Sequence, residues 1–489
     1  MSAYQDLLAF ARQTEALAQI SGRLGWDQQT VMPRGANAQR SEEMAALEEV
    51  LHARRTDPRL GEWLDQAEAP DEAGAAILRE LRRDYARNTK VPARLASELA
   101  RITPLAQTAW EEARLAGNVS AFLPWLTQMI ALRREEGQAI AGGGDPYDAL
   151  MDDYEPQTSS DTVAATFDRM RPRLVALREA ILGADTPPAL TGHFAQEGQM
   201  RISRRLAEHF GYDFTRGRID LAVHPFSSGS GDDVRITTRV AVEEPFNCLY
   251  STIHEVGHAA YEQGVDAAYA LTPIGRGVSM GVHESQSRIY ENQLGRSRAF
   301  CGWLYGAMEQ EFGALSVADA DGFYAAANRV NTGYIRTEAD EVQYNLHIML
   351  RFDLERALIR GALEAGDLEE AWNTRFEADF GYPVDRPANG VLQDVHWSVG
   401  LFGYFPTYAL GNIYAGCLYQ TLRADLPDLD AQLSAGDTSA ATGWLNARLQ
   451  KFGALNGPRQ TIANACGFDP DEGPLMDYLE AKFTELYKL

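Results

Sequence analysis

The chain contains 489 residues, with 45 Lys+Arg against 69 Asp+Glu, so its formal net charge at pH 7 is −24. Nucleic-acid backbones and anionic membrane surfaces are bound by basic patches, so an acidic excess of this size argues against both as partners. Hydrophobic residues make up 45% of the chain, which is typical of a globular protein with a large core.

The cysteines and the N-terminus point to a reducing compartment. The four cysteines lie far apart and form no CxxC pair, which argues against a disulfide framework or a thiolate metal site. The first residues, MSAYQDLLAFARQTEA, lack the basic start and apolar run of a signal peptide. Nowhere do about 18 apolar residues run without interruption, as a membrane-spanning helix would require. We therefore expect reduced thiols and a cytoplasmic protein.

Helical periodicity dominates the N-terminal half, residues 1–215. Between Leu95 and Ala113, apolar residues recur at spacings of three and four, which is typical of one face of a long helix. Similar patterns predict helices over Leu7–Leu24, Ser41–Ala53, Ala76–Asn88, Val119–Ala141 and Ser160–Leu182. The Gly/Pro breaks between them are too short to be flexible linkers, so we predict a single, mainly helical domain over residues 1–489.

The period changes to two between about residues 220 and 245. Ile236, Thr238, Val240 and Val242 fall on one side of this segment, which predicts a short strand over 235–242. An antiparallel partner is expected over 221–226, joined through a turn at 227–231. Helices resume at Asn247 and continue to the C-terminus, so residues 216–425 form the region that carries the chemistry and residues 426–489 the C-terminal helices.

The pattern HExxH occurs as His254-Glu-Val-Gly-His258, in a helix expected to end at Gly264. On a helix, His254 and His258 project from the same face and can bind one metal ion. Glu255 directly follows His254 and so projects from a neighbouring part of the helix surface. From there it can take a proton from a water at the open metal position. The alternative is a buried helix with two hydrogen-bonded histidines.

A catalytic site of this kind needs a third protein ligand. We predict Glu284, which follows His258 by 26 positions, because the Gly- and Pro-containing loop 271–281 can bring a second helix back against the first. His283 and Asp340 are the alternatives for this ligand. A His₂Glu set suits Zn²⁺ and also accepts Co²⁺ or Mn²⁺.

Two further groups of residues suit peptide hydrolysis. Arg235 and Arg336 lie beside acidic residues that can orient them, and an arginine fork matches a substrate carboxylate, although a structural ion pair is the alternative for each. His396, Tyr404 and Tyr408 can donate a hydrogen bond to the oxyanion of a tetrahedral intermediate. Each tyrosine also fits a core position.

Six short motifs occur in order along the chain: His224-Pro-Phe226, Asp233-Val-Arg-Ile-Thr237, His254-Glu-Val-Gly-His258, His283-Glu-Ser-Gln286, Ile335-Arg-Thr-Glu-Ala-Asp340 and Gly390-Val-Leu-Gln-Asp-Val-His-Trp397. With these motifs, and over nearly its whole length, the sequence resembles the carboxypeptidase Taq family of zinc metallopeptidases.

This resemblance implies a mainly helical fold with a deep substrate groove and a small antiparallel sheet beside the metal, similar to neurolysin and angiotensin-converting enzyme. It implies a homodimeric metallocarboxypeptidase that removes single C-terminal residues from peptides with broad specificity. By motif, it assigns the metal to His254, His258 and Glu284, general base and acid catalysis to Glu255, the substrate carboxylate to Arg336, and less specific site roles to His224, Arg235, His396 and Tyr408.

Three other functions remain open from the sequence. An oligoendopeptidase could use the same metal site without needing a terminal carboxylate. A helical binding protein could hold the metal as a structural ion, and a metal-assisted hydrolase could act on a small amide. For a carboxypeptidase, the acidic net charge cannot describe the site, so we expect a local excess of positive charge where the substrate binds.

Overall fold

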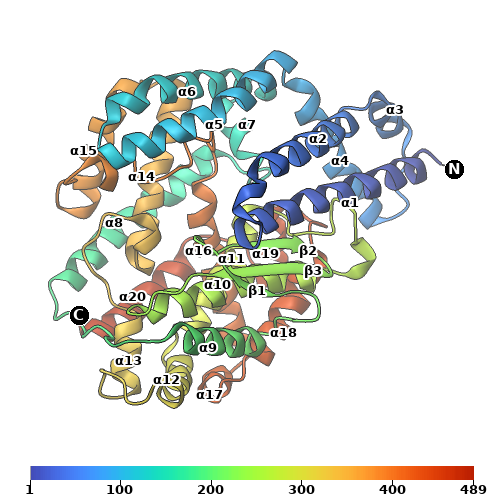
Figure 1. The fold of residues 1–489 in the computed structure, drawn as a ribbon. Coiled ribbons are helices and arrows are strands. Elements are labelled where there is room, and N and C mark those ends of the chain that lie inside the picture. The colour runs from blue at the N-terminus through green and yellow to red at the C-terminus, as the bar shows by residue number, and fades with distance from the viewer. Residues whose placement is uncertain (1) are drawn as a thin grey trace. The chain divides into compact units, whose positions relative to one another are not determined.

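The computed structural model describes residues 2–489, and most of them lie in helices (Figure 1). The chain divides into two compact units, each assembled from three segments. Unit 1 comprises Met1–Asn88, Pro187–Arg329 and Tyr414–Pro470, and unit 2 comprises Thr89–Thr186, Val330–Ile413 and Asp471–Leu489. The mainly helical class is as predicted; a single peptidase domain over 1–489 stays a prediction.

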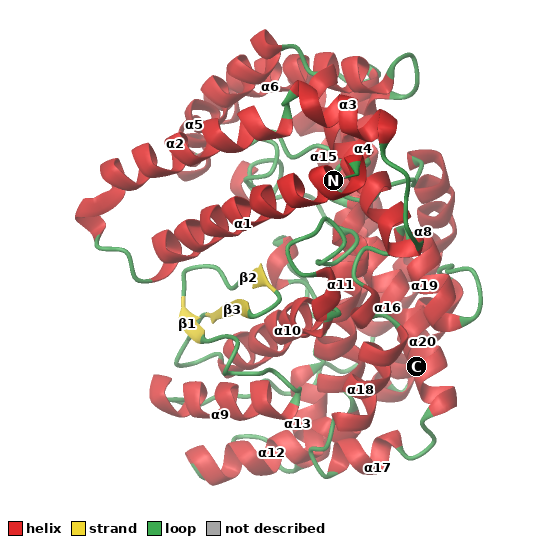
Figure 2. Cartoon of the chain, turned by 90° about the vertical axis from the view of Figure 1, so that its right-hand side faces the viewer, coloured by secondary structure: helices red, strands yellow, loops and turns green. Residues whose placement is uncertain are grey.

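Unit 1 contains the N-terminal helices, the sheet and the HExxH helix. Its helices are α1 (Ala3–Thr30), α2 (Asn37–Arg55), α3 (Pro58–Gln66), α4 (Glu72–Lys90, whose last two residues belong to unit 2), α9 (Gln196–His209), α10 (Pro245–Gly264), α11 (Met280–Arg288), the π-helix η3 (Ile289–Gly295), α12 (Arg298–Phe312), α13 (Ala320–Ala327), α17 (Leu429–Ser434), α18 (Ser439–Arg448) and α19 (Pro458–Cys466). Helices α1 and α2 pack side by side, and α10 packs against α9, α11 and the sheet (Figure 2).

Unit 2 is built around α14 (Glu341–Arg360), a helix that is buried along most of its length. It packs against α6, α7, α8 and α15. The helices of this unit are α5 (Ala93–Ala116), α6 (Val119–Ala141), α7 (Pro146–Met151), α8 (Ser160–Leu182), α14, α15 (Leu368–Phe380) and α20 (Gly473–Tyr487), while α16 (Pro406–Asp425) begins in unit 2 and ends in unit 1.

Short 3-10 turns lie between the longer helices: η1 (Arg34–Ala36), η2 (Ala267–Tyr269), η4 (Arg336–Glu338), η5 (Ala365–Asp367), η6 (Pro387–Asn389) and η7 (Gln450–Phe452). Two long helices have the bounds that the sequence predicts. Asn118 caps α6 by accepting a hydrogen bond from the N–H of Ala121, and Gly142 ends that helix with φ +58°, a conformation that favours glycine. Ser159 caps α8 in the same way.

The sheet has three strands, β1 (Ile219–Leu221), β2 (Ser227–Ser230) and β3 (Asp233–Thr238), in the order β1-β3-β2. The antiparallel hairpin pairs β2 with β3, whereas β1 pairs with β3 in parallel. The prediction of 221–226 as the antiparallel partner and 227–231 as the turn is therefore wrong. Residues 227–230 are themselves the strand, and the tight turn lies at Gly231-Asp232, where Gly231 has φ +62°.

Two expectations concern the chain as a whole. All four cysteines are buried, and within residues 2–489 none of them forms a disulfide with another. Within residues 2–489, none of the helices has the length and apolar content that crossing a membrane requires.

Candidate active site

The site in unit 1 depends on a close approach of α10 and α11 at Gly257. A Cβ atom at Gly257 would lie 2.5 Å from the carbonyl oxygen of Gln286 and 2.6 Å from the Cα of Ser287, so any larger residue would force the helices apart. The loop before α11 ends at Ser279, whose side chain caps the helix by accepting from the N–H of Val282. As predicted, the loop returns a second helix against the HExxH helix.

This packing brings His254, His258 and Glu284 together. Glu284 Oε2 lies 3.5 Å from His258 Nε2 and 3.9 Å from His254 Nε2, and the three ligand atoms lie within 4.8 Å of one another. Protein ligands at 2.0–2.2 Å from a tetrahedral ion lie roughly 3.5 Å apart, so these separations suit one small divalent ion. Two imidazoles and one carboxylate are also a donor set of the zinc-hydrolase kind. The residues present therefore fit a metal.

The protonation states of His258 and Glu284 also suit a metal. Burial lowers the pKa of His258 to about 3, so its imidazole is neutral. Burial alone would raise the pKa of Glu284, but Arg288, whose Nε donates to Glu284 Oε1 at 2.7 Å, and the two histidines hold that pKa well below its usual range. The carboxylate is therefore ionised and ready to bind a cation.

Glu255 is buried beside this cluster. Its side chain comes from the turn of α10 between the two histidines, and the residue is 6% exposed. Burial raises the pKa of Glu255 to about 7, an effect that His254 opposes and Glu284 strengthens. A carboxyl group with such a pKa can accept and return a proton near neutral pH.

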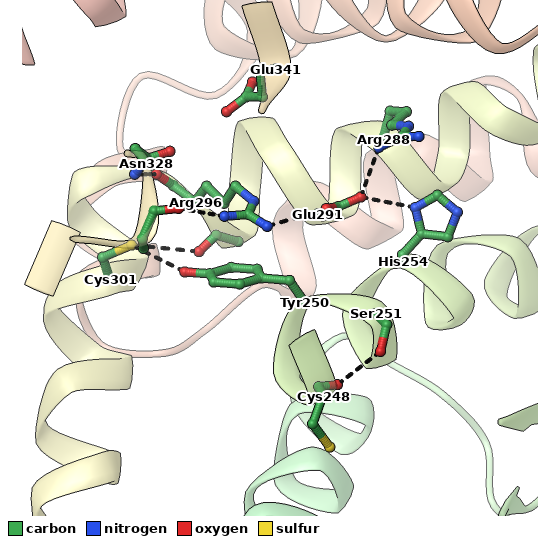
Figure 3. Close-up of polar contacts among 12 residues, drawn as sticks. Cys248, Tyr250, Ser251, His254, Arg288, Glu291, Arg296, Cys301, Asn328 and Glu341 are labelled. Atoms are coloured by element: carbon green, nitrogen blue, oxygen red, sulfur yellow. Dashed lines mark hydrogen bonds and ion pairs between the residues drawn. The ribbon is translucent and has the colours of Figure 1, made fainter. Parts of the chain in front are cut away.

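Glu291 contacts His254 at Nδ1, whereas Glu284 lies at Nε2 of the same ring, and this contact was not predicted from the sequence. Its Oε2 lies 2.9 Å from His254 Nδ1 and accepts from Arg288 Nη1 at 3.2 Å, as Figure 3 shows, while Oε1 lies 3.4 Å from Arg296 Nη2. Although burial alone would raise the pKa of Glu291, Arg288 and His254 lower it to about 2. The residue lies on the π-helix η3, and π-turns often occur at functional sites. Its position seven residues after Glu284, on the same helix face, was the available sequence signal.

Neither alternative third ligand belongs to the cluster. His283 Nδ1 lies 2.6 Å from His258 Nδ1, and His283 Nε2 lies 2.9 Å from Glu262 Oε1. His283 therefore contacts Nδ1 of the candidate ligand His258 and is not one of the three clustered residues. Asp340 is in unit 2, where it caps α14 by accepting from the N–H groups of Val342 and Gln343 at 3.0 Å.

In unit 2, Arg336 lies in a buried cluster with Asp394 and Arg351. Arg336 Nε and Nη2 donate to Asp394 Oδ1 at 3.1 and 3.0 Å, and Arg351 Nε donates to Asp394 Oδ2 at 2.7 Å. Arg336 Nη1 donates to the hydroxyl of Tyr344 at 3.2 Å. Two guanidinium groups thus share one carboxylate, which leaves one positive charge in excess within the cluster.

Two more predicted residues lie at this cluster. The ring of Tyr408 lies 5.0 Å from the Arg336 guanidinium, and the Tyr408 hydroxyl lies 3.5 Å from His396 Nε2. Burial lowers the pKa of His396 to about 3, so this imidazole adds no charge. Tyr404 packs edge-on to Tyr408.

Arg235 and His224 lie in unit 1 and are not among the three candidate ligands. Arg235 is paired through Nε and Nη2 with the carboxylate of Asp233, at 2.7 and 3.0 Å, and stacks over Trp26. His224 is exposed in the segment between β1 and β2. Their predicted roles stay predictions.

Comparisons with known proteins agree with this geometry. The sequence model of the carboxypeptidase Taq (M32) metallopeptidase family matches residues 6–483. The chain belongs to this family. It is 40% identical to thermostable carboxypeptidase 1 of Thermus thermophilus, over 99% of both chains, and 34% identical to carboxypeptidase 1 of Bacillus subtilis, over 95% of this chain and 94% of the other.

Solved structures of the family have the same fold. The M32 carboxypeptidase of Deinococcus radiodurans superimposes with a TM-score of 0.96 at 37% identity, over 100% of both chains. Metallocarboxypeptidase 1 of Trypanosoma cruzi gives 0.95 at 31% identity, over 98% of this chain and 99% of the other. This M32 protein is therefore a metal-dependent carboxypeptidase, a peptide hydrolase, and the oligoendopeptidase alternative is not favoured.

Proposed function

We propose that the protein releases single residues of broad identity from the C-terminus of peptides at a zinc ion held by His254, His258 and Glu284. The observation that carries this proposal is the convergence of three ligand atoms beside a buried carboxyl group that is not one of the ligands. Cobalt or manganese would also suit the donor set. The M32 family membership supports a divalent metal of this kind.

Glu255 is the proposed general base and acid. A bound zinc ion supplies Lewis acidity, which polarises the scissile carbonyl and makes a water molecule easier to deprotonate. Glu255 accepts the proton from that water and passes it to the leaving amine. Its burial supports this role, because a carboxyl group with a pKa of about 7 can both take and return a proton.

Arg336 is the proposed anchor of the substrate's terminal carboxylate. Asp394 and Tyr344 use three of its five N–H groups, which leaves one N–H on each terminal nitrogen for an incoming carboxylate. The excess positive charge of the cluster favours an anion there. A peptide continuing past this point would leave the charge without a partner, which favours removal of terminal residues.

His396 and Tyr408 are the proposed donors to the oxyanion, and His224 and Arg235 the proposed contacts with the rest of the peptide. The proximity of His396 and Tyr408 to Arg336 supports the first assignment. We also propose a cytoplasmic homodimer that binds neither nucleic acid nor membranes, which agrees with the net charge of −24.

Two measurements test the proposal. The E255Q variant should retain the wild-type content of bound zinc and lose activity by roughly 10²–10⁴-fold, the usual contribution of a general base. A peptide and its C-terminally amidated form should be cleaved at very different rates by the wild type. Full activity of E255Q would remove Glu255 from the mechanism, and equal rates on the two peptides would refute the carboxylate anchor.

A further inference from the structure

The two ligand histidines are supported by different groups. His254 Nδ1 lies 2.9 Å from a carboxylate oxygen, Oε2 of Glu291. His258 Nδ1 instead meets Nδ1 of His283 at 2.6 Å, and Glu262 Oε1 lies 2.9 Å from the other nitrogen of His283. On its Nδ1 side, the second ligand is thus connected to a carboxylate through another imidazole.

This arrangement fixes the position of each ring hydrogen. A histidine that binds a metal through Nε2 carries its hydrogen on Nδ1. His258 Nδ1–H must then donate, so Nδ1 of His283 must accept and carry no hydrogen. Neutral His283 therefore carries its hydrogen on Nε2, where Glu262 Oε1 can accept it.

We propose that His283 and Glu262 are positioning residues that hold His258 in the tautomer and ring orientation needed to bind the metal. The inference rests on the metal site proposed above. Groups that orient a metal-binding histidine commonly change metal affinity by 10- to 100-fold when they are removed.

The surroundings of His283 keep its ring in this orientation. Glu262 Oε1 also accepts from the N–H of Gly277 at 2.9 Å, which ties the loop before α11 to the carboxylate. A Cβ atom at Gly277 would lie only 2.6 Å from Cδ2 of His283, and the ring of Tyr261 lies 5.3 Å away on centroids. The Tyr261 hydroxyl accepts from the N–H of Val278 at 3.2 Å, so the loop before α11 and the ring of Tyr261 hold each other in place.

Asparagine and glutamine at position 283 separate positioning from packing. The side-chain amide of asparagine reaches about as far as Nδ1 of histidine, so H283N can still accept from His258. Glutamine reaches about as far as Nε2 and fills more of the volume, but it leaves His258 Nδ1 without its acceptor. Zn²⁺ affinity should be measured on metal-free protein by competition with a chromophoric chelator. We expect H283Q to bind Zn²⁺ roughly 10- to 100-fold more weakly than wild type and H283N to stay within a few-fold. Equal affinities of the two variants, or the reverse order, would overturn the proposal.

A double-mutant cycle tests the role of Glu262. Because Glu262 acts through His283, we expect E262A to weaken Zn²⁺ binding and to add little when combined with H283Q. Independent, additive losses would show that Glu262 does not act through His283. The control is H209Q, because His209 is also partly buried in unit 1 but binds the carbonyl oxygen of Gly436, and it should leave the affinity unchanged.

Two further measurements distinguish misfolding of a variant, failure of the proposed metal site and failure of the positioning role. Melting temperatures of the metal-free variants identify any that fail to fold, and the H283N and H283Q comparison is made only between variants with matching values. If wild-type protein itself binds no Zn²⁺, the proposed metal site fails. If wild type binds Zn²⁺ and every variant binds it equally, the metal site stands and the positioning role of His283 and Glu262 fails.

Discussion

Glu355 is a buried carboxyl group that should control how the stability of the protein changes with pH. It lies on α14 with none of its surface exposed. It accepts hydrogen bonds from the hydroxyl of Tyr147 at 2.9 Å, from Trp397 Nε1 at 2.8 Å and from the N–H of Gly403 at 3.1 Å. Burial raises the pKa of Glu355 from 4.5 to about 7, although the three donors oppose the change.

The direction of the effect follows from which state of the chain, folded or unfolded, binds the proton of Glu355 more tightly. With a pKa raised on folding, Glu355 holds its proton more tightly in the folded chain, so its favourable contribution is complete below about pH 4.5 and disappears as pH rises through about 7. A pKa difference of about 2.5 corresponds to roughly 3 kcal/mol. The unfolding entropy of a chain of this size is about 1 kcal/mol/K. The loss of this contribution as pH rises should therefore lower the melting temperature by about 3 °C.

The comparison should be made with E355Q, which cannot titrate and keeps one acceptor oxygen. Melting temperatures of wild type and variant would be measured from pH 5 to pH 8.5 by differential scanning fluorimetry. We expect the difference between them to shift by about 3 °C across this range, in favour of the variant at high pH. For E377Q, which changes an exposed carboxylate on α15, the difference should stay constant. A constant difference for E355Q as well would mean that the three donors cancel the effect of burial, and the reasoning would be refuted.

Three further predictions concern the site. The variant G257A should separate α10 from α11, costing about 1–3 kcal/mol and weakening Zn²⁺ binding, as calorimetry and chelator competition would detect; wild-type values for both would refute the close-approach argument. Replacing Arg336 by lysine removes the second donor of the fork, so KM for unblocked peptides should rise by about 10- to 100-fold with kcat little changed; a larger rise in R235K would identify Arg235 as the anchor instead. Treatment with a chelator should abolish activity and lower the melting temperature by about 3 °C at metal concentrations near 100 Kd, and Zn²⁺ should reverse both; full activity after complete metal removal would contradict metal dependence.

Much of the helical frame could be predicted because its determinants are local. The bounds of α6 and α8 follow from an N-cap residue before each helix and, for α6, from a glycine after it. The candidate ligands could be predicted for the same reason, since a spacing of four on one helix fixes the relative direction of His254 and His258.

The features that escaped prediction depend on contacts between distant segments. The parallel pairing of β1 with β3 brings Ile219 opposite Ile236, a register that no local pattern specifies. The support of His258 by His283 and Glu262 arises only after α11 packs on α10, and the spacing of Glu291 from Glu284 does not by itself specify the contact of Glu291 with His254.

Burial favours Arg336 over Arg235 as the proposed anchor for a substrate carboxylate. Arg235 and Arg336 each share an aspartate with a second arginine, Asp233 with Arg23 and Asp394 with Arg351, so pairing alone does not distinguish them. The Arg235 side chain is 25% exposed, so water and salt screen its charge, whereas the Arg336 side chain is 7% exposed and shares Asp394 with the fully buried Arg351. At 4 Å, a pair of unit charges is worth about 1 kcal/mol in bulk water but about 4 kcal/mol at the effective dielectric constant of about 20 that describes protein sites, and the excess charge at Arg336 lies in the second kind of environment. In a chain of net charge −24, a buried positive excess is therefore where a carboxylate gains most by binding.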